Sequence, residues 1–352
     1  MTDPKRVLLA MSGGVDSSVA GGLLRAQGHE VVGVTLHLWD AEGEAKVGRC
    51  CAPEDRRDAR QSADALGIPH YVLDERQAFA RDVVEPFVRE YQAGRTPSPC
   101  VHCNRTVKLS YLFQVADRFG CSHVATGHYA RVVRGPDGHA LLRGRDRQKD
   151  QSYFLFGLDP KALSRLVFPL GEMVKDESRH AAREMGLPNA DKPDSQELCF
   201  VPDGDIAGFI ERRSGRAEAG EIVDEDGTVL GQHAGVAGFT VGQRRGLGLG
   251  GGPVRYVLRV LANENRVVVG PEGGLSGNEL LARDAYWLNA PREDEFEAEV
   301  RIRYRHAPAR ARVRRTADGF SARFVEPQRA ITPGQAAVVY RGEEVLGGGF
   351  IV

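Results

Sequence analysis

The sequence lacks any apolar run that approaches the roughly 18 residues needed to cross a bilayer. An apolar stretch near the start, residues 7–11, is also too short to form the core of a signal peptide. The pattern therefore predicts neither a membrane-spanning nor a secreted protein. We expect a cytosolic protein that does not bind membranes.

An excess of charge of one sign is lacking as well. The 352 residues include 47 lysines and arginines against 48 aspartates and glutamates, a net charge of −1. This balance gives no global attraction to nucleic acid, so any RNA binding must come from local patches. A hydrophobic fraction of 41% and a charged fraction of 27% are typical of a soluble globular protein. The length allows two or three domains.

Cysteine is scarce, and in a reducing compartment six cysteines do not suggest a disulfide framework. Closely spaced cysteines are then candidates for catalysis or metal binding. Cys100 and Cys103 form a C-x-x-C pair on a loop that Pro97 and Pro99 are expected to stiffen, and Cys199 ends a second loop. A structural zinc site normally needs a second such pair, which is missing, and no helix is expected to begin at Cys100 as in a thioredoxin-like pair. Cys121 precedes an apolar strand and is expected in the core.

Residues 7–18 read V-L-L-A-M-S-G-G-V-D-S-S, which predicts a strand, a tight glycine turn and a helix. Such a turn points backbone N–H groups and the positive end of a helix dipole at one small volume, where phosphate binds. Ser12, Ser17 and Ser18 add hydroxyl donors. Asp16 would cap the helix or hold the Mg²⁺ that accompanies a nucleotide. The alternative is a glycine turn with a serine cap and no ligand.

The glycine turn lacks the lysine of G-x-x-x-x-G-K-[ST] and the glycine spacing of G-x-G-x-x-G. It resembles instead the S-G-G-x-D-S signature of the PP-loop ATP pyrophosphatases, which cleave ATP between the α and β phosphates.

Strands and helices alternate through the first half of the chain. We expect strands at residues 30–38, 70–73 and 123–126, helices at 54–66, 76–93, 106–119 and 175–185, and a hairpin of 131–133 with 140–143. This order predicts a parallel, doubly wound α/β sheet with its ligands at the carboxyl ends of the strands. Residues 126–129 should then face the same crevice as residues 12–18.

From about residue 220 helical periodicity disappears and short alternating segments take over. We expect strands at residues 254–260, 266–269, 296–304, 319–325, 336–340 and 345–351, which indicates a small barrel. Seven arginines lie nearby, namely Arg301, Arg303, Arg305, Arg310, Arg312, Arg314 and Arg315. Alternate arginines on one strand share a face, so they form either a phosphate-binding stripe or a solvated strand face.

Seven motifs occur in one order along nearly the entire chain. They are M-S-G-G-V-D-S-S, G-R-T-P-S-P-C-V-H-C-N, A-T-G-H-Y, K-D-Q-S-Y-F-L, D-S-Q-E-L-C-F, V-G-Q-R-R-G-L-G and T-P-G-Q-A-A-V. In this order the chain resembles the bacterial tRNA-specific 2-thiouridylase family, MnmA. The resemblance implies a PP-loop (adenine nucleotide α-hydrolase-like) domain at residues 1–205, a small central domain at 206–275 and a C-terminal β-barrel tRNA-binding domain at 276–352.

The same resemblance implies the reaction. The C2 oxygen of the wobble uridine, position 34, is replaced by sulfur in tRNA(Lys), tRNA(Glu) and tRNA(Gln). The oxygen is first adenylated with ATP and Mg²⁺, because a carbonyl oxygen is a poor leaving group. A thiol or persulfide then supplies the nucleophile, and the sulfur comes from a cysteine-desulfurase-derived donor or from sulfide.

Residue roles follow from the resemblance, position by position. Cys103 matches the catalytic nucleophile and Cys199 the persulfide carrier. The ATP contacts match Ala10, Met11, Ser12, Gly13, Gly14, Val15, Asp16, Ser17, Leu36 and Gly127. Contacts with the target base match Ser98, Pro99 and Cys100. Contacts with the rest of the tRNA match His128, Lys149, Asp150, Gln151, Arg303, Tyr304 and Gln335.

Cys100 departs from the family pattern, because many members have aspartate there. Three thiolates with an open fourth position suit an iron–sulfur cluster, so a [4Fe–4S] cluster on Cys100, Cys103 and Cys199 competes with the disulfide and persulfide mechanism. An extra thiol beside a persulfide invites disulfide exchange unless a metal holds it, which favours the cluster.

Two other functions remain as alternatives. A PP-loop amide-forming ligase would leave Cys103 and Cys199 without a role. A zinc-stabilised RNA-binding module would leave the phosphate loop without one.

Overall fold

The structure is a computed structural model that describes residues 5–40, 53–135, 138–194, 198–201 and 204–352. The chain forms two compact units, each described by itself below. Unit 1 comprises Met1–Val83, Cys100–Gly204 and Glu343–Val345, and unit 2 comprises Val84–Pro99, Asp205–Gly342 and Leu346–Val352. Residues 84–99, which we expected in the first domain, therefore group with the β-rich part of the chain.

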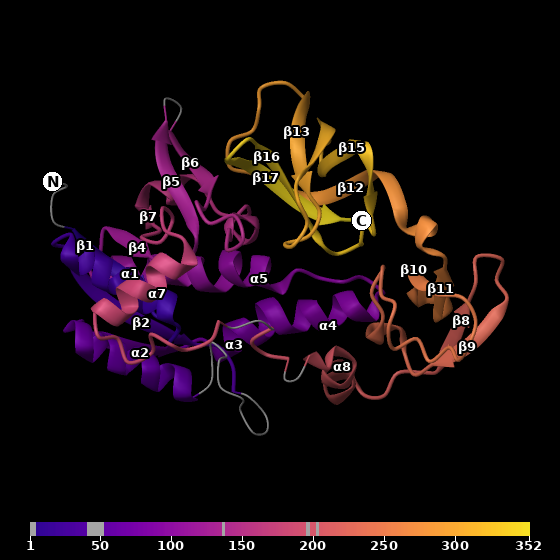
Figure 1. Ribbon diagram of the computed structural model, residues 1–352, viewed down its shortest axis with the longest axis horizontal. Coiled ribbons are helices and arrows are strands. Elements are labelled where there is room, and N and C mark those ends of the chain that lie inside the picture. Colours follow the sequence, from indigo (N-terminus) through magenta and orange to yellow (C-terminus); the bar gives the residue numbers. More distant parts are fainter. Residues whose placement is uncertain (1–4, 41–52, 136–137, 195–197, 202–203) are drawn as a thin grey trace. The chain divides into compact units, whose positions relative to one another are not determined.

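Unit 1 is built on a parallel sheet with strand order β3-β2-β1-β4-β7 (Figure 1). The strands are β1 (Arg6–Ala10), β2 (Glu30–His37), β3 (His70–Asp74), β4 (His123–Ala125) and β7 (Leu166–Val167). Every neighbouring pair in this sheet runs parallel. The expected doubly wound α/β sheet is confirmed, with β7 as an additional short strand.

Helices cover both faces of this sheet. Helices α1 (Val15–Ala26) and α2 (Pro53–Leu66) pack on Val7 and Leu9 through Ala20, Leu24 and Ala63. Helix α6 (Ser110–Arg118) packs against β1 and β4, and α7 (Lys175–Glu184) packs against α1. Strand β1 lies between β2 and β4, so the chain turns in opposite directions from it. The loops after β1 and β4 open at such a switch point, where α/β sheets bind ligands.

Two expected helices begin or continue differently from the prediction. The helix expected at residues 76–93 consists of α3 (Arg76–Phe79), a π-helical segment η1 (Ala80–Val84) and α4 (Glu85–Gln92). Pro86 near the start of α4 has no N–H to donate, which explains the irregular turn before it. The helix expected from residue 106 begins earlier, with α5 (Pro99–His102) and a π-helical segment η2 (Cys103–Leu109) leading into α6. Among the described residues, no helix is long and apolar enough to cross a membrane.

The remaining elements of unit 1 include the expected hairpin of β5 (Ala130–Gly135) and β6 (Gly138–Arg143). Residues 136 and 137 of its turn lie outside the described residues. Two short 3₁₀ helices follow, η3 (Ser152–Phe154) and η4 (Pro160–Arg165).

Unit 2 contains a central sheet of order β10-β11-β8-β9, preceded by helix α8 (Ile206–Ser214). Its strands are β8 (Gly220–Val223), β9 (Val229–His233), β10 (Tyr256–Leu261) and β11 (Arg266–Gly270). Ile222, Phe239, Val257 and Val267 form its core. Only β10 and β11 were expected, because the short β8 and β9 have little alternation.

The C-terminal strands of unit 2 form a closed barrel, coloured orange to yellow in Figure 1. They are β12 (Ser276–Trp287), β13 (Glu295–Arg301), β14 (Ala309–Arg315), β15 (Gly319–Arg329), β16 (Ala336–Arg341) and β17 (Glu344–Ile351). The order is β12-β15-β14-β13-β16-β17, and β17 pairs again with β12. Closure removes the open edges of the sheet, and it confirms the predicted barrel.

Phe320 on β15 should contribute strongly to the stability of this barrel. Its side chain is 1% exposed, and its ring lies 5.7 Å from that of Trp287. Phe320→Ala is expected to lower the free energy of unfolding by about 3–5 kcal/mol, because it leaves a cavity. Urea unfolding would be followed by tryptophan fluorescence in a Trp39→Phe background, which leaves Trp287 as the reporter. Val325→Ala, 75% exposed on the same strand, is the control and should cost less than about 0.5 kcal/mol. A similar small effect of Phe320→Ala would contradict this view of the core.

Candidate active site

The glycine turn between β1 and α1 is held by its own serines. Gly14 is the N-cap of α1. Ser17 Oγ donates to the Gly14 carbonyl (2.9 Å) and accepts from the Ser12 amide (3.2 Å). Ser18 is fully buried, donates to the same carbonyl and accepts from Asn189 Nδ2 (3.0 Å). The expectation that Ser18 donates to phosphate is wrong, since it supports the turn from inside.

Gly127, which follows β4, lies directly against the first turn of α1. A Cβ atom at this position would be 2.7 Å from the Ser17 amide nitrogen and 2.9 Å from the Asp16 carbonyl carbon. Only glycine allows this close approach. Leu36 lies at the same end of the sheet, two residues beyond the β2 partner of Ala10. The structure therefore brings the expected ATP contacts from the three neighbouring strands β1, β2 and β4 to one end of the sheet.

Asp16 is not the N-cap of α1, because Gly14 holds that position, without a side-chain cap hydrogen bond. Its two carboxylate oxygens each accept from Lys175 Nζ at 2.8 Å, and Oδ1 also accepts from the Tyr129 hydroxyl at 2.9 Å. The Tyr129 hydroxyl lies 2.7 Å from Ser178 Oγ. Burial, together with the negative charge of Asp16, raises the pKa of Tyr129 well above its ordinary value, so the phenol stays protonated and keeps donating to Asp16.

Lys175 joins Asp16 to a second carboxylate. Its Nζ lies 2.7 Å from Asp194 Oδ1, and Asp194 also accepts from Lys149 (2.8 Å) and Arg179 (3.1 Å). Burial alone would raise the pKa of Asp194, but the hydrogen bonds from Lys149 and Lys175 outweigh it and lower the pKa. A chain of ion pairs thus runs from Asp16 at the glycine turn through Lys175 to Asp194. Asp194 is the first residue of the D-S-Q-E-L-C-F motif, and it also pairs with Lys149 of the K-D-Q motif.

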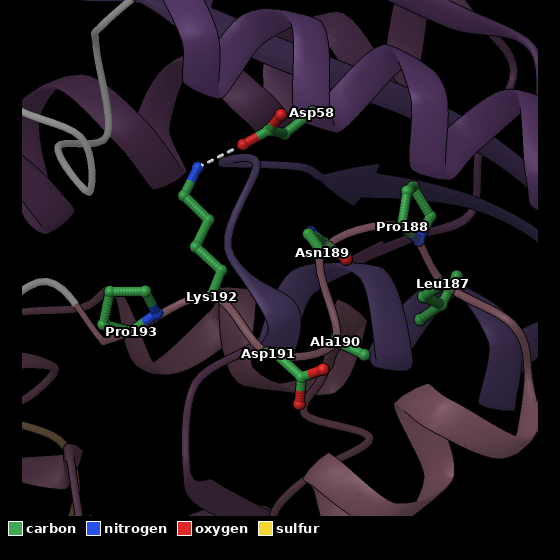
Figure 2. A pocket seen from close by; sticks show the side chains of 8 residues that line it. All are labelled: Asp58, Leu187, Pro188, Asn189, Ala190, Asp191, Lys192 and Pro193. Carbon is green, nitrogen blue, oxygen red and sulfur yellow. Dashed lines mark hydrogen bonds and ion pairs between the residues drawn. The ribbon is translucent and has the colours of Figure 1, made fainter.

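The loop after α7 supports the glycine turn from another side. Lys192 Nζ contacts the carboxylates of Asp55 and Asp58, and it donates to the Gly13 carbonyl at 3.3 Å. Figure 2 shows its side chain reaching Asp58 across a pocket of about 320 Å³ lined by Asp58 and residues 187–193. Burial lowers the pKa of Lys192, yet the hydrogen bonds that it donates to Asp55 and Asp58 raise the pKa overall. Asn189 Nδ2 donates to the same Gly13 carbonyl at 3.0 Å. This loop fixes the backbone of the turn.

In the A-T-G-H-Y and K-D-Q motifs, the side chains of His128 and Asp150 both have hydrogen-bond partners within unit 1. His128 bonds Thr126 Oγ1 at 2.7 Å, and burial lowers the pKa of His128 to about 3, so the ring is neutral near pH 7. Asp150 is 1% exposed and accepts from the amides of Gly144 and Ser152, both at 3.1 Å. The structure therefore places the Asp150 side chain in the interior of unit 1, and its contact with RNA stays a prediction.

Gln151 Oε1 also has a partner inside unit 1, since it accepts from the Tyr129 amide at 3.0 Å. Lys149, whose side chain is 39% exposed, is half-buried, as Gln151 is.

Cys100 and Cys103 lie on a helix rather than on the loop we expected. Pro99 begins α5, and Cys103 begins the π-helical segment η2. Proline fits the first turn of a helix, where its missing N–H costs nothing, so the proline taken to stiffen a loop in fact starts the helix. Cys100 is exposed, Cys103 is 5% exposed and Cys199 is half-buried. Single π turns inside helices are frequent at functional sites.

Cys121 is buried, as expected, and burial raises the pKa of its thiol. Within the described ranges, which include all three cysteines of the predicted cluster, no group of three or more His, Cys, Asp or Glu side chains is arranged to hold a metal ion. The residues present therefore do not form a ready site for a [4Fe–4S] cluster.

The arginines of unit 2 do not form the uncompensated stripe that one interpretation predicted. Arg310, Arg312 and Arg314 alternate on the exposed face of β14, but each lies opposite a glutamate of β13, in the pairs Glu299–Arg310, Glu297–Arg312 and Glu295–Arg314. Opposite charges directly across a strand pair neutralise each other. This pairing favours the solvated strand face.

The predicted tRNA contacts of unit 2 lie outside β14. Arg303 donates to the Val241 carbonyl at 2.9 Å, and Gln335 donates to the carbonyls of Thr96 (2.9 Å) and Pro97 (3.1 Å). Tyr304 lies just after β13, where the ring is 5.3 Å from the guanidinium of the buried Arg301. Ser98 is buried. Their roles toward RNA stay predictions.

Comparison with known proteins is decisive for the family. The profile described as "tRNA methyl transferase HUP domain" matches residues 5–203, "tRNA methyl transferase PRC-barrel domain" matches 207–271, and "Aminomethyltransferase beta-barrel domain" matches 277–351. The tRNA-specific 2-thiouridylase MnmA of Sorangium cellulosum is 54% identical, over 98% of this chain and 92% of that protein. The chain belongs to the MnmA family. The MnmA of Acidithiobacillus ferrooxidans is 50% identical, over 99% of this chain and 98% of that one.

MnmA family membership agrees with the motif-based resemblance, and it adds no geometry to the site. A solved 4-thiouridine synthetase–RNA complex with bound ATP is similar at a TM-score of 0.37 and 16% identity, over 59% of this chain and 50% of that one.

Several site residues escaped the sequence-based reasoning. Lys175, Tyr129, Asn189, Lys192 and Asp194 all reach the glycine turn or its partners from distant segments. A usable signal existed for Lys175, because a phosphate turn that lacks its own lysine needs a cation from elsewhere. The sequence P-N-A-D-K-P at residues 188–193 is a second signal, since two prolines restrict the loop that carries Asn189 and Lys192.

Proposed function

We propose that this protein is an ATP-dependent tRNA sulfurtransferase that converts the wobble uridine, position 34, of tRNA(Lys), tRNA(Glu) and tRNA(Gln) to 2-thiouridine in the cytoplasm. The observation that carries the proposal is the near-full-length match to MnmA proteins. The glycine turn at the switch point and the cysteines in the same unit support it. An amide-forming ligase would leave Cys103 and Cys199 without a role.

The first step activates the base. The uridine O2 attacks the α phosphorus of ATP, a P–O bond forms, and the bond to the β phosphate breaks to release pyrophosphate. The amides at the start of α1 and the dipole of that 12-residue helix favour the negative charge of the phosphates. Asp16 is the residue that would hold Mg²⁺, and because Lys175 bonds both of its carboxylate oxygens, the two cations would share one carboxylate.

The second step delivers sulfur. Half-buried Cys199 is accessible to a cysteine-desulfurase-derived donor, which would leave a persulfide on its Sγ. The Cys103 thiolate attacks this Sγ, forming a Cys103–Cys199 disulfide and releasing hydrosulfide. The hydrosulfide adds to C2 of the adenylated uridine, and AMP leaves with the former O2. A thiol reductant then supplies two electrons to restore both cysteines.

The cluster remains the second proposal for the sulfur step, and the extra thiol of Cys100 is what favours it. In that account Cys100, Cys103 and Cys199 would hold the cluster, which would present sulfide to the adenylated base. Because the described residues do not form a ready metal site, no step above depends on a cluster.

The function is tested by mass spectrometry of nucleosides from tRNA of cells that lack this protein. Loss of 2-thiouridine derivatives from the three tRNAs, restored by the wild-type gene, is expected. Unchanged 2-thiouridine would contradict the proposal. A Cys103→Ser gene serves as the matched control, because it should be expressed and yet fail to restore the modification.

A further inference from the structure

Three motifs that are far apart in the sequence meet at residues 96–98 within unit 2. The Thr96 amide donates to the Pro333 carbonyl at 2.8 Å. Gln335 Nε2 donates to the carbonyls of Thr96 (2.9 Å) and Pro97 (3.1 Å). The Ala336 amide donates to Ser98 Oγ at 3.1 Å. The T-P-G-Q-A segment thus bonds three successive residues of the G-R-T-P-S-P motif.

A second set of contacts ties the same junction to the V-G-Q-R-R-G segment. Thr96 Oγ1 donates to Thr240 Oγ1 at 3.1 Å. Arg303 Nη2 donates to the Val241 carbonyl at 2.9 Å and contacts Thr332 Oγ1. Arg303 therefore connects Val241 with Thr332. Each of these two residues is next in the chain to a residue that bonds Thr96, namely Thr240 and Pro333.

The backbones at this junction approach too closely for a side chain at Gly334. Its φ is +88°, and a Cβ atom there would lie 2.9 Å from the Thr96 amide nitrogen and carbonyl oxygen. Thr332 and Ala336, on either side, are buried. Hydrogen bonds in such a place are costly to leave unmade, so the junction holds one backbone conformation.

Gln335 uses both donor hydrogens of its amide in these bonds, since an amide NH₂ has two hydrogens and the two carbonyls accept them. Only its carbonyl oxygen remains to meet RNA. Arg303 is likewise engaged inside unit 2. These two residues, expected from the family resemblance to contact tRNA, are thus built into the support of the segment that precedes Cys100.

We propose that Gln335, Arg303 and Gly334 form a clasp that fixes residues 96–98 before any tRNA binds. The inference depends on the proposed function for its consequence. Ser98, Pro99 and Cys100 are the predicted contacts with the target base, and the clasp sets the backbone from which α5, the helix that carries Cys100, starts. Gln335 and Arg303 are positioning residues for base and thiol.

Hydrogen exchange of the full chain without tRNA tests the clasp. In Gln335→Met the amide of Thr96 and the peptide covering residues 94–99 should exchange about tenfold faster, because two partly buried hydrogen bonds are lost. The β16 amides of residues 338–340 should be unchanged, which separates a local loosening from a destabilised barrel. Thiolation should lose kcat about tenfold or more, while the Kd for tRNA changes less than about threefold.

Two further variants sharpen the test. Gly334→Ala keeps the glutamine but pushes a methyl group against Thr96, and it should loosen the same peptide. Gln328→Met is the matched control, because Gln328 lies on the same barrel and bonds only the nearby Glu326 carbonyl (2.9 Å) in the contacts described; it should leave exchange unchanged. Unaltered exchange in Gln335→Met together with weaker tRNA binding would overturn the clasp. Exchange does not depend on activity, so it decides the clasp even if 2-thiouridine formation were not the reaction.

Discussion

An enzyme that carries Lys175→Met is expected to release pyrophosphate at least about a hundredfold more slowly than the wild type when tRNA and ATP are supplied. Lys175 is buried and bonds Asp16 through both carboxylate oxygens and Asp194 through Oδ1. Methionine keeps the length of the side chain but removes the cation. Two carboxylates would then share a poorly hydrated space without their common partner, a change that costs about 3–5 kcal/mol in buried pairs.

The matched control is Arg179→Met. Arg179 donates to the same Asp194 oxygen at 3.1 Å, yet no contact with Asp16 is described for it, so pyrophosphate release should stay within a few-fold of wild type. Lys175→Arg retains the charge and should recover part of the activity. Thermal unfolding of each variant shows whether the fold survives. Normal pyrophosphate release by well-folded Lys175→Met would show that this lysine has a structural role only.

The parallel sheet could be predicted because its strands are short apolar runs that glycines and helices separate. Residues 7–9, 31–35 and 124–126 are buried on both faces in the structure, as continuous apolar runs suggest. Since all carboxyl ends lie at one edge, the meeting of Gly127 with the glycine turn followed from strand order alone. The barrel was predicted from alternation in the same way, although β12 and β14 were missed as separate strands.

The ion pairs around the glycine turn could not be predicted, because Lys175 and Lys192 lie more than a hundred residues from Asp16 and Asp55. No local pattern specifies such contacts. The helix start at Pro99 was missed because proline occurs both in rigid loops and at the first position of helices. The pairing of the β14 arginines with glutamates could have been predicted. The sequences E-F-E-A-E at residues 295–299 and R-A-R-V-R at 310–314 indicate two strands of complementary charge.

The second large effect concerns the cysteines. Cys103→Ser and Cys199→Ser are each expected to reduce 2-thiouridine formation by about a thousandfold or more, because a serine hydroxyl neither carries a persulfide nor attacks one. Cys100→Ser should stay within about tenfold of wild type. Pyrophosphate release should continue in all three variants, since activation of the base precedes delivery of sulfur.

The measurement is mass spectrometry of tRNA incubated with each variant, ATP and a persulfide donor, with enzyme prepared without oxygen and its iron determined. Cys121→Ser is the matched control, because Cys121 is buried in the core and no chemistry is assigned to it. Brown enzyme with about four irons per chain, inactive in all three of Cys100→Ser, Cys103→Ser and Cys199→Ser and active with inorganic sulfide, would replace the persulfide account by the cluster. Iron-free enzyme that thiolates tRNA from a persulfide, with Cys100→Ser still active, would leave Cys103 and Cys199 as the two residues that carry sulfur.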